Sequence, residues 1–362
     1  MAWISCGRAG RLVRERFVVD GSVRVAAFGD TVGLPRLIEE LREGCVRVLV
    51  RAELRPEQAP ALDELAHRRG LELLVQPRPS AGAAARRAFV RKLSAYASDL
   101  IVVDSYSMLL PAPVLAVAKV ACLNLHGALL PAYRGPNPIQ WALINDERKT
   151  GVTLHLMDNG FDTGAIVDQR VIPIAINDTW RELYALQDMA ARTLLHDTLP
   201  RYLRGEIRTV AQDPAESSTF PRRTPEDGII DWERPALAIH NLIRALVAPL
   251  PGAFYERRDG SKVVLDSYVP LPAVLALKFG DAGRRRLEHN QLSLEPAPEE
   301  GEGTSVIVFR ARDRGSGLVL GKLCIREIDW ERRRATIDMD FSHDDAPPAV
   351  AAVLAETGLR TR

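Results

Sequence analysis

The chain has 362 residues, enough for two or three domains of about 100 to 200 residues each. Its net charge of +1 argues against a polyanionic partner such as nucleic acid, and no apolar run reaches the length of about 18 residues that predicts a membrane span. The cysteines form no CxxC pair, so we expect reduced thiols in a cytoplasmic protein and neither a disulfide framework nor a metal site; they are Cys6, Cys45, Cys122 and Cys324.

The first half of the chain alternates between two kinds of pattern. Residues 1–22 carry little pattern and lack the apolar core of a signal peptide, so we interpret them as an N-terminal extension. From there, β-rich runs alternate with helical spacings: strands are predicted over 23–30, 46–52, 71–76, 99–107 and 120–126, and helices over 34–44, 59–70, 83–98 and 111–119. This alternation predicts an open, mostly parallel Rossmann-like α/β sheet, in which ligands sit beyond the carboxyl ends of the strands.

The second half begins with two runs that favour paired strands. Residues 151–158 and 163–174 alternate in polarity and flank the turn "NGFD", between predicted helices at 138–146 and 179–205. A polar, Pro-rich stretch then precedes a helix at 235–247 and a hairpin at 249–271. Residues 281–304 are charged and rich in Gly and Pro, so we expect a second linker or a long loop there, followed by strands at 305–311, 317–329 and 333–341.

These patterns give a domain plan. We expect an extension at 1–22, a catalytic domain at 23–210, a linker at 211–235, and a helix with the start of a small β-rich domain at 236–280. Residues 281–362 form a further β-rich tail in this plan.

One stretch, "LNLHGALLPAYRGP" at 123–136, concentrates candidate site residues. Asn124 and His126 lie two apart in a predicted strand, so their side chains point to the same face. The Gly and Pro residues that follow forbid a helix and predict a shaped loop. The pattern therefore predicts a strand end that presents an amide and an imidazole to a pocket.

Three motifs in this order resemble the folate-dependent formyltransferases, the family of the sugar N-formyltransferases and the methionyl-tRNA formyltransferases. They are "NLHGALLPAYRGPNPIQWALIND", "TGVTLHLMDNGFDTGAIVDQ" and "FPRRTPEDGIIDWERPALAIHNLIRALVAPLPGAF", and the likeness covers about residues 90–260, with a weaker match from 23. The resemblance implies 10-formyltetrahydrofolate as the formyl donor and co-substrate. It also implies that Asn124, His126 and Asp162, the last within "DTG", are the catalytic residues.

The resemblance implies cofactor contacts too. The segment "DSYSMLLP" stands where the backbone of this family cups the pterin ring. The residues carried over as cofactor-binding are Ser105, Tyr106, Met108, Leu109, Leu110, Gly127, Asp158, Gly160 and Asp162.

The three catalytic residue types fit formyl transfer to an amine. The reaction passes through a tetrahedral carbon with an oxyanion, to which the Asn124 side chain can donate. His126 can stabilise that oxygen when protonated or relay the proton lost by the amine, and Asp162 can hold the imidazole and accept the proton through water. Because a neutral amine is already a good nucleophile, no Ser or Cys nucleophile is required.

Several other motifs have structural interpretations. His155 alternates with apolar residues in "VTLHLM", which favours a core or edge histidine, whereas Arg134 is interpreted either as a loop anchor or as a ligand contact. The run "RRR" at 284–286 is interpreted as a solvated face. The stretch "RDRGSG" at 312–317 spells the Arg-x-x-Gly-x-Gly of a CoA loop, but it lies between two predicted strands, where a hairpin turn is simpler.

The acceptor amine follows from two further features. The connection at 50–70 lacks the basic, Gly-rich insertion of the transfer-RNA enzymes, and the segment 227–254 is similar to enzymes of nucleotide-linked amino sugars, notably the UDP-4-amino-4-deoxyarabinose formyltransferases. We therefore expect a small-molecule acceptor, a nucleotide-linked amino sugar. The alternatives are a small amine such as N-hydroxyornithine in siderophore assembly, then methionyl-tRNA, or a catalytically dead folate or nucleotide-sugar binding protein. A general Rossmann oxidoreductase is disfavoured because no G-x-G-x-x-G follows the first strand.

The tail departs from the formyltransferase pattern. The stretch "GLVLGKLCIREIDWERRRATIDMDF" faintly resembles the central strands of an N-acetyltransferase. We interpret it as a degenerate module of that kind, which serves homodimer formation or substrate recruitment.

Overall fold

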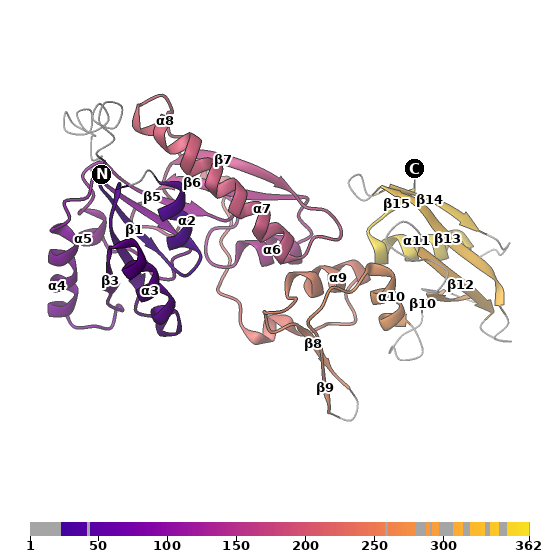
Figure 1. Ribbon diagram of the computed structural model, residues 1–362. Coiled ribbons are helices and arrows are strands. Elements are labelled where there is room, and N and C mark those ends of the chain that lie inside the picture. The colour runs from indigo at the N-terminus through magenta and orange to yellow at the C-terminus, as the bar shows by residue number, and fades with distance from the viewer. Residues whose placement is uncertain are drawn as a thin grey trace. The chain divides into compact units, whose positions relative to one another are not determined.

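The structure, a computed structural model, describes residues 23–41, 44–257, 260–279, 287–289, 292–296, 307–313, 319–329, 334–339 and 346–361. The described residues form two compact units (Figure 1). The first takes them from Met1–Pro138, Thr150–Ile172 and Ala185–Pro221, and the second from Ile139–Lys149, Pro173–Tyr184 and Arg222–Arg362. The predicted extension at 1–22, the run 284–286 and residues 314–317 of "RDRGSG" lie outside the described residues.

A seven-stranded sheet forms the centre of the first unit (Figure 1). Its spatial order is β3 (Glu72–Gln76), β2 (Val46–Ala52), β1 (Val25–Gly29), β4 (Leu100–Asp104), β5 (Ala121–His126), β6 (Lys149–Leu156) and β7 (Ile166–Pro173). The strands from β3 to β5 pair in parallel, and β6 pairs antiparallel to β5. The predicted fold class, an open and mostly parallel α/β sheet followed by a smaller β-rich region, is confirmed.

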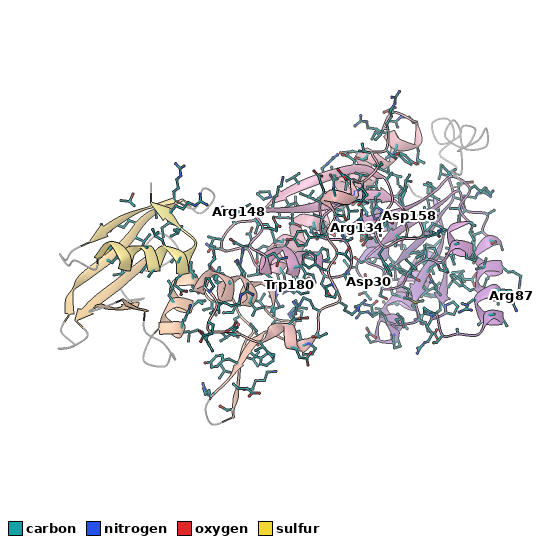
Figure 2. The ribbon with its side chains drawn as sticks, turned by 180° about the vertical axis from the view of Figure 1, so that it is seen from behind. Asp30, Arg87, Arg134, Arg148, Asp158 and Trp180 are labelled. Atoms are coloured by element: carbon teal, nitrogen blue, oxygen red, sulfur yellow. The ribbon has the colours of Figure 1, made fainter. Side chains whose placement is uncertain are left out.

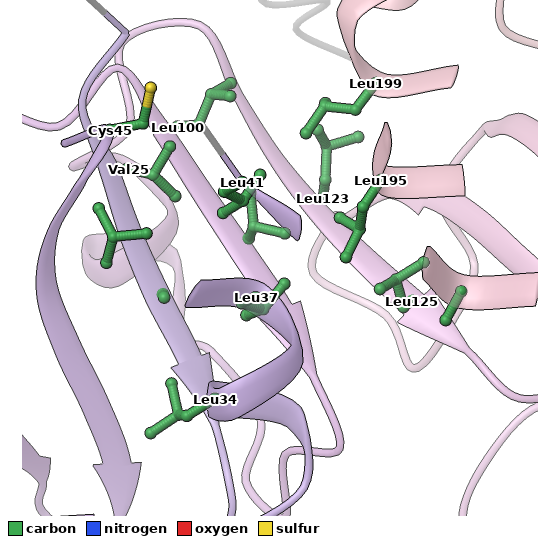
Figure 3. Close-up of a cluster of buried hydrophobic side chains, with 14 of the residues drawn as sticks. Val25, Leu34, Leu37, Leu41, Cys45, Leu100, Leu123, Leu125, Leu195 and Leu199 are labelled. Atoms are coloured by element: carbon green, nitrogen blue, oxygen red, sulfur yellow. The ribbon is translucent and has the colours of Figure 1, made fainter. Parts of the chain in front are cut away.

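Helices cover both faces of this sheet because its strands are apolar on both faces. The helices are α2 (Gly33–Glu40), α3 (Ala59–Arg69), α4 (Ala83–Ser94), α5 (Ala112–Leu115), α7 (Trp180–Thr193) and α8 (Leu199–Leu203), whereas α6 (Pro138–Ile144) belongs to the second unit. One core cluster joins the sheet to α2, α3, α7 and α8, and a second joins its other face to α4 and α5. In the first cluster Leu34 and Leu37 of α2 are fully buried (Figure 3), each worth about 1.5–3 kcal/mol of transfer free energy.

The long helix predicted over 179–205 is interrupted. Helix α7 continues into a π-helical turn at Leu194–Thr198 and then into α8, which ends before Gly205. Gly205 has a φ of +79°, the left-handed conformation that commonly terminates a helix. Within the described part of the chain, no helix is long and apolar enough to cross a membrane.

The carboxyl ends of the central strands lie level with one another, which is what positions the site. Gly29 pairs with Asp104 between β1 and β4, and Asp104 pairs with Leu125 between β4 and β5. A close backbone approach holds this edge together, since a Cβ atom on Gly33 would come within 2.0 Å of the Asp104 carbonyl oxygen. The loops after β1, β4 and β5 therefore leave the sheet at neighbouring points, whereas β6 runs in the opposite direction.

The second unit has smaller sheets than the first, and it combines helices with mostly antiparallel strands. Its elements are α9 (Ala236–Ala245), β8 (Ala253–Glu256), β9 (Lys262–Leu265), α10 (Leu271–Phe279), β10 (Leu287–His289), β11 (Leu292–Pro296), β12 (Ile307–Asp313), β13 (Val319–Asp329), β14 (Arg334–Met339), α11 (Ala346–Thr357) and β15 (Arg360–Thr361). β8 and β9 form the predicted hairpin, and β10 to β15 form a six-stranded sheet in chain order. The buried Lys278 ammonium of α10 pairs with Glu356 of α11 at 2.7 Å.

The structure corrects one expectation in this unit. Residues 281–304 were expected to be a second linker or a long loop, yet β10 and β11 lie within this range and pair antiparallel. The alternation of apolar and polar residues in "LEHNQLSLEP" is the signal of a strand pair, and the high charge of the flanking residues concealed it. The strands β12 and β13 also pair antiparallel, which agrees with a hairpin connection at "RDRGSG".

Candidate active site

Strand β5 presents Asn124 and His126 at its carboxyl end, as the alternation predicts. Its antiparallel partner β6 sets Asn124 opposite His155 and His126 opposite Thr153. The His126 side chain is only 7% exposed, whereas Asn124 is half-buried. The sheet therefore places an amide and two imidazoles in one corner of its edge.

Asp162 belongs to the loop between β6 and β7, which its own residues fold into a fixed turn. Asp158 Oδ1 accepts hydrogen bonds from Gly160 N at 2.9 Å and from Thr163 Oγ1 at 2.5 Å. Asp162 itself has a φ of +55°, a left-handed conformation that is uncommon and costly outside glycine. Such strain in a non-glycine residue is typical of functional turns, where surrounding contacts hold the side chain in place.

The structure brings the three predicted catalytic residues together around the Asp162 carboxylate. Oδ1 lies 3.4 Å from Asn124 Nδ2, and Oδ2 lies 3.5 Å from His126 Nδ1. Oδ2 also accepts a hydrogen bond of 2.9 Å from Gly135 N, in the loop after β5. The amide, the imidazole and the carboxylate thus form one cluster, although Asp162 is far from the other two in sequence.

The hydrogen bonds of His126 assign its tautomer. Nε2 lies 2.8 Å from the Tyr133 carbonyl oxygen, which can only accept, so Nε2 carries the proton. Burial lowers the pKa of His126, and the nearby Asp162 carboxylate offsets this effect only in part. The neutral ring therefore directs the lone pair of Nδ1 toward Asp162, and a proton gained at Nδ1 would face a carboxylate.

Asp162 is held in its ionised form. Burial alone would raise its pKa, but the neighbouring His126, the contact with His155 and the Gly135 amide outweigh burial, so the pKa lies well below its ordinary value. The carboxylate is therefore a fixed negative charge at neutral pH. Among the described residues, no group of three or more His, Cys, Asp or Glu side chains is arranged to hold a metal ion.

His155, interpreted from the sequence as a core or edge histidine, lies in this cluster. It is buried, but its Nε2 is 3.1 Å from Asn124 Nδ2 and 3.6 Å from Asp162 Oδ1. Its Nδ1 lies 2.7 Å from the Leu156 carbonyl oxygen, which can only accept, so Nδ1 carries a proton and Nε2 can accept from Asn124. The core interpretation is right about burial and incomplete about contacts. The pairing of the two strands that flank the site would have revealed it.

The loop after β4 contains the residues predicted to contact the cofactor. Ser105 has a φ of +52°, and the Tyr106 hydroxyl donates to Gln76 Oε1 at 2.9 Å. Gln76, the last residue of β3, also donates from Nε2 to the Leu109 carbonyl oxygen at 3.0 Å. Of the side chains in this loop, Leu110 is buried, Leu109 is exposed, and Met108 is half-buried.

The same loop contains one candidate ligand contact that the sequence analysis did not name. The Ser107 hydroxyl oxygen is buried and has no hydrogen-bond partner among the described residues. Burying a hydroxyl without a partner is unfavourable, so this atom fits a ligand group that completes its hydrogen bonding.

The other predicted cofactor residues take part in shaping the site. Gly127 follows His126, and its carbonyl oxygen accepts a hydrogen bond of 2.7 Å from Gln187 Nε2 of α7. Asp158 and Gly160 build the turn that carries Asp162. Figure 2 labels Asp158 and Arg134, which belong to the loops after β6 and β5 respectively.

Comparison with known proteins identifies the family of the chain. A family model described as formyl transferase matches residues 23–199, and a second, described as formyl transferase, C-terminal domain, matches residues 222–274. Together they match more than half of the chain. The chain belongs to the formyl transferase family. The resemblance seen in the sequence and the predicted enzyme class, a formyltransferase, are thereby confirmed.

Solved structures share the fold of this formyltransferase. A sugar N-formyltransferase from Shewanella sp FDAARGOS_354 is 21% identical with a TM-score of 0.53, over 68% of this chain and 98% of that one. A 4-N formyltransferase from Francisella tularensis is 16% identical with a TM-score of 0.56, over the same shares. An N-formyltransferase from Helicobacter canadensis, solved with folinic acid and dTDP-3-aminofucose, is 19% identical with a TM-score of 0.53, over 75% of this chain and 95% of that one.

Proposed function

We propose that this formyltransferase moves the formyl group of 10-formyltetrahydrofolate to the primary amine of a nucleotide-linked amino sugar. The observation that carries the proposal is the convergence of Asn124 and His126 on the ionised carboxylate of Asp162. An amide donor, a neutral imidazole and a fixed negative charge are the groups that acyl transfer to an amine requires, and the cluster needs no further nucleophile.

In the proposed mechanism, the chain manages one oxyanion and one proton. Asn124 Nδ2 contacts both His155 and Asp162, and its contact with Asp162, at 3.4 Å, is the longer of the two. We expect the N–H group that faces Asp162 to turn to the developing oxyanion. His126 Nδ1 accepts the proton that the amine loses as the carbon–nitrogen bond forms. Asp162 stabilises the resulting imidazolium, and the imidazolium then returns the proton to the folate nitrogen that leaves.

The loop after β4 is the proposed folate site. Gln76 holds this loop through the Leu109 carbonyl oxygen and the Tyr106 hydroxyl, and Ser107 offers a hydroxyl without a partner among the described residues. A pterin ring is rich in hydrogen-bonding groups, so it can bond to the Ser107 hydroxyl and to the backbone of this loop. When bound, the folate supplies the activated one-carbon unit. The chain supplies its orientation and the exclusion of water.

The nucleotide-sugar acceptor is supported by two kinds of observation. The enzymes that share this fold include sugar N-formyltransferases, one of them solved with dTDP-3-aminofucose. In addition, β2 is connected to α3 by only a short turn at Pro56–Gln58, without a long basic insertion for a transfer RNA. We assign catalysis to the domain at 23–210, with the linker at 211–235 and the small domain from 236 as proposed boundaries.

The acceptor is tested by incubating the purified protein with 10-formyltetrahydrofolate and a panel of amines. The panel contains dTDP- and UDP-linked amino sugars, N-hydroxyornithine and methionyl-tRNA, and tetrahydrofolate release is measured together with a mass gain of one formyl group. We expect turnover with one nucleotide sugar. Turnover only with N-hydroxyornithine or methionyl-tRNA would replace the acceptor, and folate binding without any turnover would indicate a catalytically dead binding protein.

The three catalytic assignments have their own test. Replacing Asn124, His126 or Asp162 by Ala removes the oxyanion donor, the proton acceptor or the fixed charge, so each variant should lose about 100-fold or more in kcat. Circular dichroism and thermal unfolding of each variant separate loss of chemistry from loss of fold. Near-normal turnover in a folded variant would refute the role of that residue.

We also propose a cytoplasmic location and a homodimer formed through the C-terminal region. Among the described residues Cys45, Cys122 and Cys324 are free thiols, in keeping with a reducing compartment. The small six-stranded sheet is the proposed dimerisation module. Sedimentation of the full chain measures its mass, and a strictly monomeric protein would rule out the dimer.

A further inference from the structure

Gln212, in the segment predicted to be a linker, makes a set of hydrogen bonds at the active site. Its Nε2 donates to the Asp162 carbonyl oxygen and to the Gly164 carbonyl oxygen, both at 2.7 Å. Its Oε1 accepts from Arg134 Nε at 3.1 Å and from Arg134 Nη2 at 2.7 Å. One neutral amide therefore ties the turn that carries Asp162 to the loop that follows β5.

The loop at the other end of this tie holds the catalytic histidine. Arg134 follows Tyr133, whose carbonyl oxygen accepts the hydrogen bond from His126 Nε2. Asp162 Oδ2 reaches the same loop through Gly135 N. The separation between His126 Nδ1 and the Asp162 carboxylate thus depends on how firmly these two loops are joined.

Residues 210–220, the segment around Gln212, are called the strap. The strap is itself fixed at both of its ends. At one end Val210 and Ile166, the first residue of β7, exchange two backbone hydrogen bonds of 2.8 Å. At the other end Arg134 N donates to the Ser218 carbonyl oxygen at 2.9 Å, and the rings of Tyr133 and Phe220 stack at 4.8 Å. Gln212 is therefore held in place by backbone contacts on either side of it.

We propose that Gln212 is a positioning residue for formyl transfer, which joins the Asp162 turn to the His126 loop and so sets the geometry of the proton acceptor and its carboxylate. The proposal rests on the function proposed above. A neutral amide suits this task because it satisfies two carbonyl groups and a guanidinium without adding a charge beside the carboxylate. This role requires both ends of the amide, because Nε2 donates to the turn that carries Asp162 and Oε1 accepts from Arg134 in the loop after β5.

Two variants of Gln212 and one control test the proposal. Gln212→Met removes every hydrogen bond of the side chain. Gln212→Glu keeps an acceptor for Arg134 but loses the two N–H groups that face the carbonyls of Asp162 and Gly164. The matched control is Ser217→Ala, because Ser217 Oγ donates only to the Pro214 carbonyl oxygen at 2.8 Å, within the strap.

We expect both Gln212 variants to lower kcat by about 10- to 100-fold, with smaller changes in the KM values for folate and acceptor, because misplacement of catalytic groups by about 1 Å has effects of this size. Ser217→Ala should match the wild type. A wild-type kcat in both Gln212 variants would overturn the proposal. A wild-type kcat in Gln212→Glu alone would also overturn it, because it would confine the role of Gln212 to its contact with Arg134.

A second measurement does not depend on turnover. NMR titration of the His126 imidazole reports the proximity of Asp162, since Asp162 and His155 are the titratable groups that face this ring. In Gln212→Met the pKa of His126 should fall below that of the wild type as the carboxylate withdraws. An unchanged titration would show that Gln212 does not set this distance. If the wild-type protein formylates no amine at all, the proposed function fails and the titration alone decides the positioning role.

Discussion

The charge on Asp162 is the feature of the site that a single substitution isolates best. In Asp162→Asn the side chain keeps its shape, and an amide oxygen can still accept the hydrogen bond from Gly135 N. What is lost is the negative charge opposite His126 Nδ1, at 3.5 Å. The variant therefore tests electrostatic stabilisation of the imidazolium with little change in packing.

The magnitude follows from this distance. Two unit charges at 3.5 Å attract by about 5 kcal/mol at the effective dielectric constant of about 20 that describes protein sites. The two side chains are 7% and 17% exposed, so solvent screens the interaction only slightly. Because each 1.4 kcal/mol corresponds to about tenfold in rate, we expect Asp162→Asn to lower kcat by about three orders of magnitude.

The assay is single-turnover formyl transfer with saturating donor and acceptor, so that binding and product release do not contribute. The matched control is Asp168→Asn, in β7. Burial alone would raise the pKa of Asp168, but the hydrogen bonds from Thr198, Gln169 and Arg170 together outweigh it, so this pKa is also lowered. These partners lie outside the catalytic cluster. The control should lose stability in urea and keep the rate constant of the folded enzyme.

A rate constant for Asp162→Asn within about tenfold of the wild type would refute the reasoning, because it would mean that His126 does not become an imidazolium beside this carboxylate during the reaction. An equal loss in the Asp168 control would point instead to a general sensitivity of the sheet edge.

Two further predictions concern pH and packing. Because burial lowers the pKa of His126 below its ordinary value of 6.5, the folded state disfavours protonation. The stability that this contributes is complete above pH 6.5 and decreases as the pH falls toward the folded-state pKa. Urea unfolding at several pH values measures the free energy of unfolding, and His126→Asn should flatten its dependence on pH in this range. Gly33→Ala should lower the thermal midpoint by an amount equivalent to about 1–3 kcal/mol, since its Cβ would come within 2.0 Å of the Asp104 carbonyl oxygen. Gly82→Ala, where nothing lies within 4 Å, is the control and should not be destabilised.

Much of the first unit was predictable because its signals are local. The strand at Val46–Ala52 coincides with the predicted one, and the alternation in Ala121–His126 correctly places Asn124 and His126 on one face. Such patterns depend only on residues a few positions apart. The nearness of Asp162 came from the resemblance to a family, since no local pattern relates it to β5.

The features missed by the sequence depend on register and on long-range contacts. His155 enters the site because β6 pairs antiparallel with β5 in a register that sets it opposite Asn124. Gln212 reaches Asp162 across 50 residues and Arg134 across 78. Its polar, Pro-rich surroundings are typical of a linker, and composition alone cannot distinguish a linker from a strap that hydrogen-bonds to a site.

Glutamine recurs at the loops of this site, and the recurrence has a physical reason. Gln76 holds the loop after β4, Gln187 holds Gly127, and Gln212 holds the Asp162 turn, each through a side-chain amide that donates to a backbone carbonyl. A lysine or arginine in these places would also satisfy the carbonyls, but its charge would compete with the His126 imidazolium for the single carboxylate. An amide fixes the loops without altering the field at His126, so the site keeps a rigid frame and a neutral base at the same time.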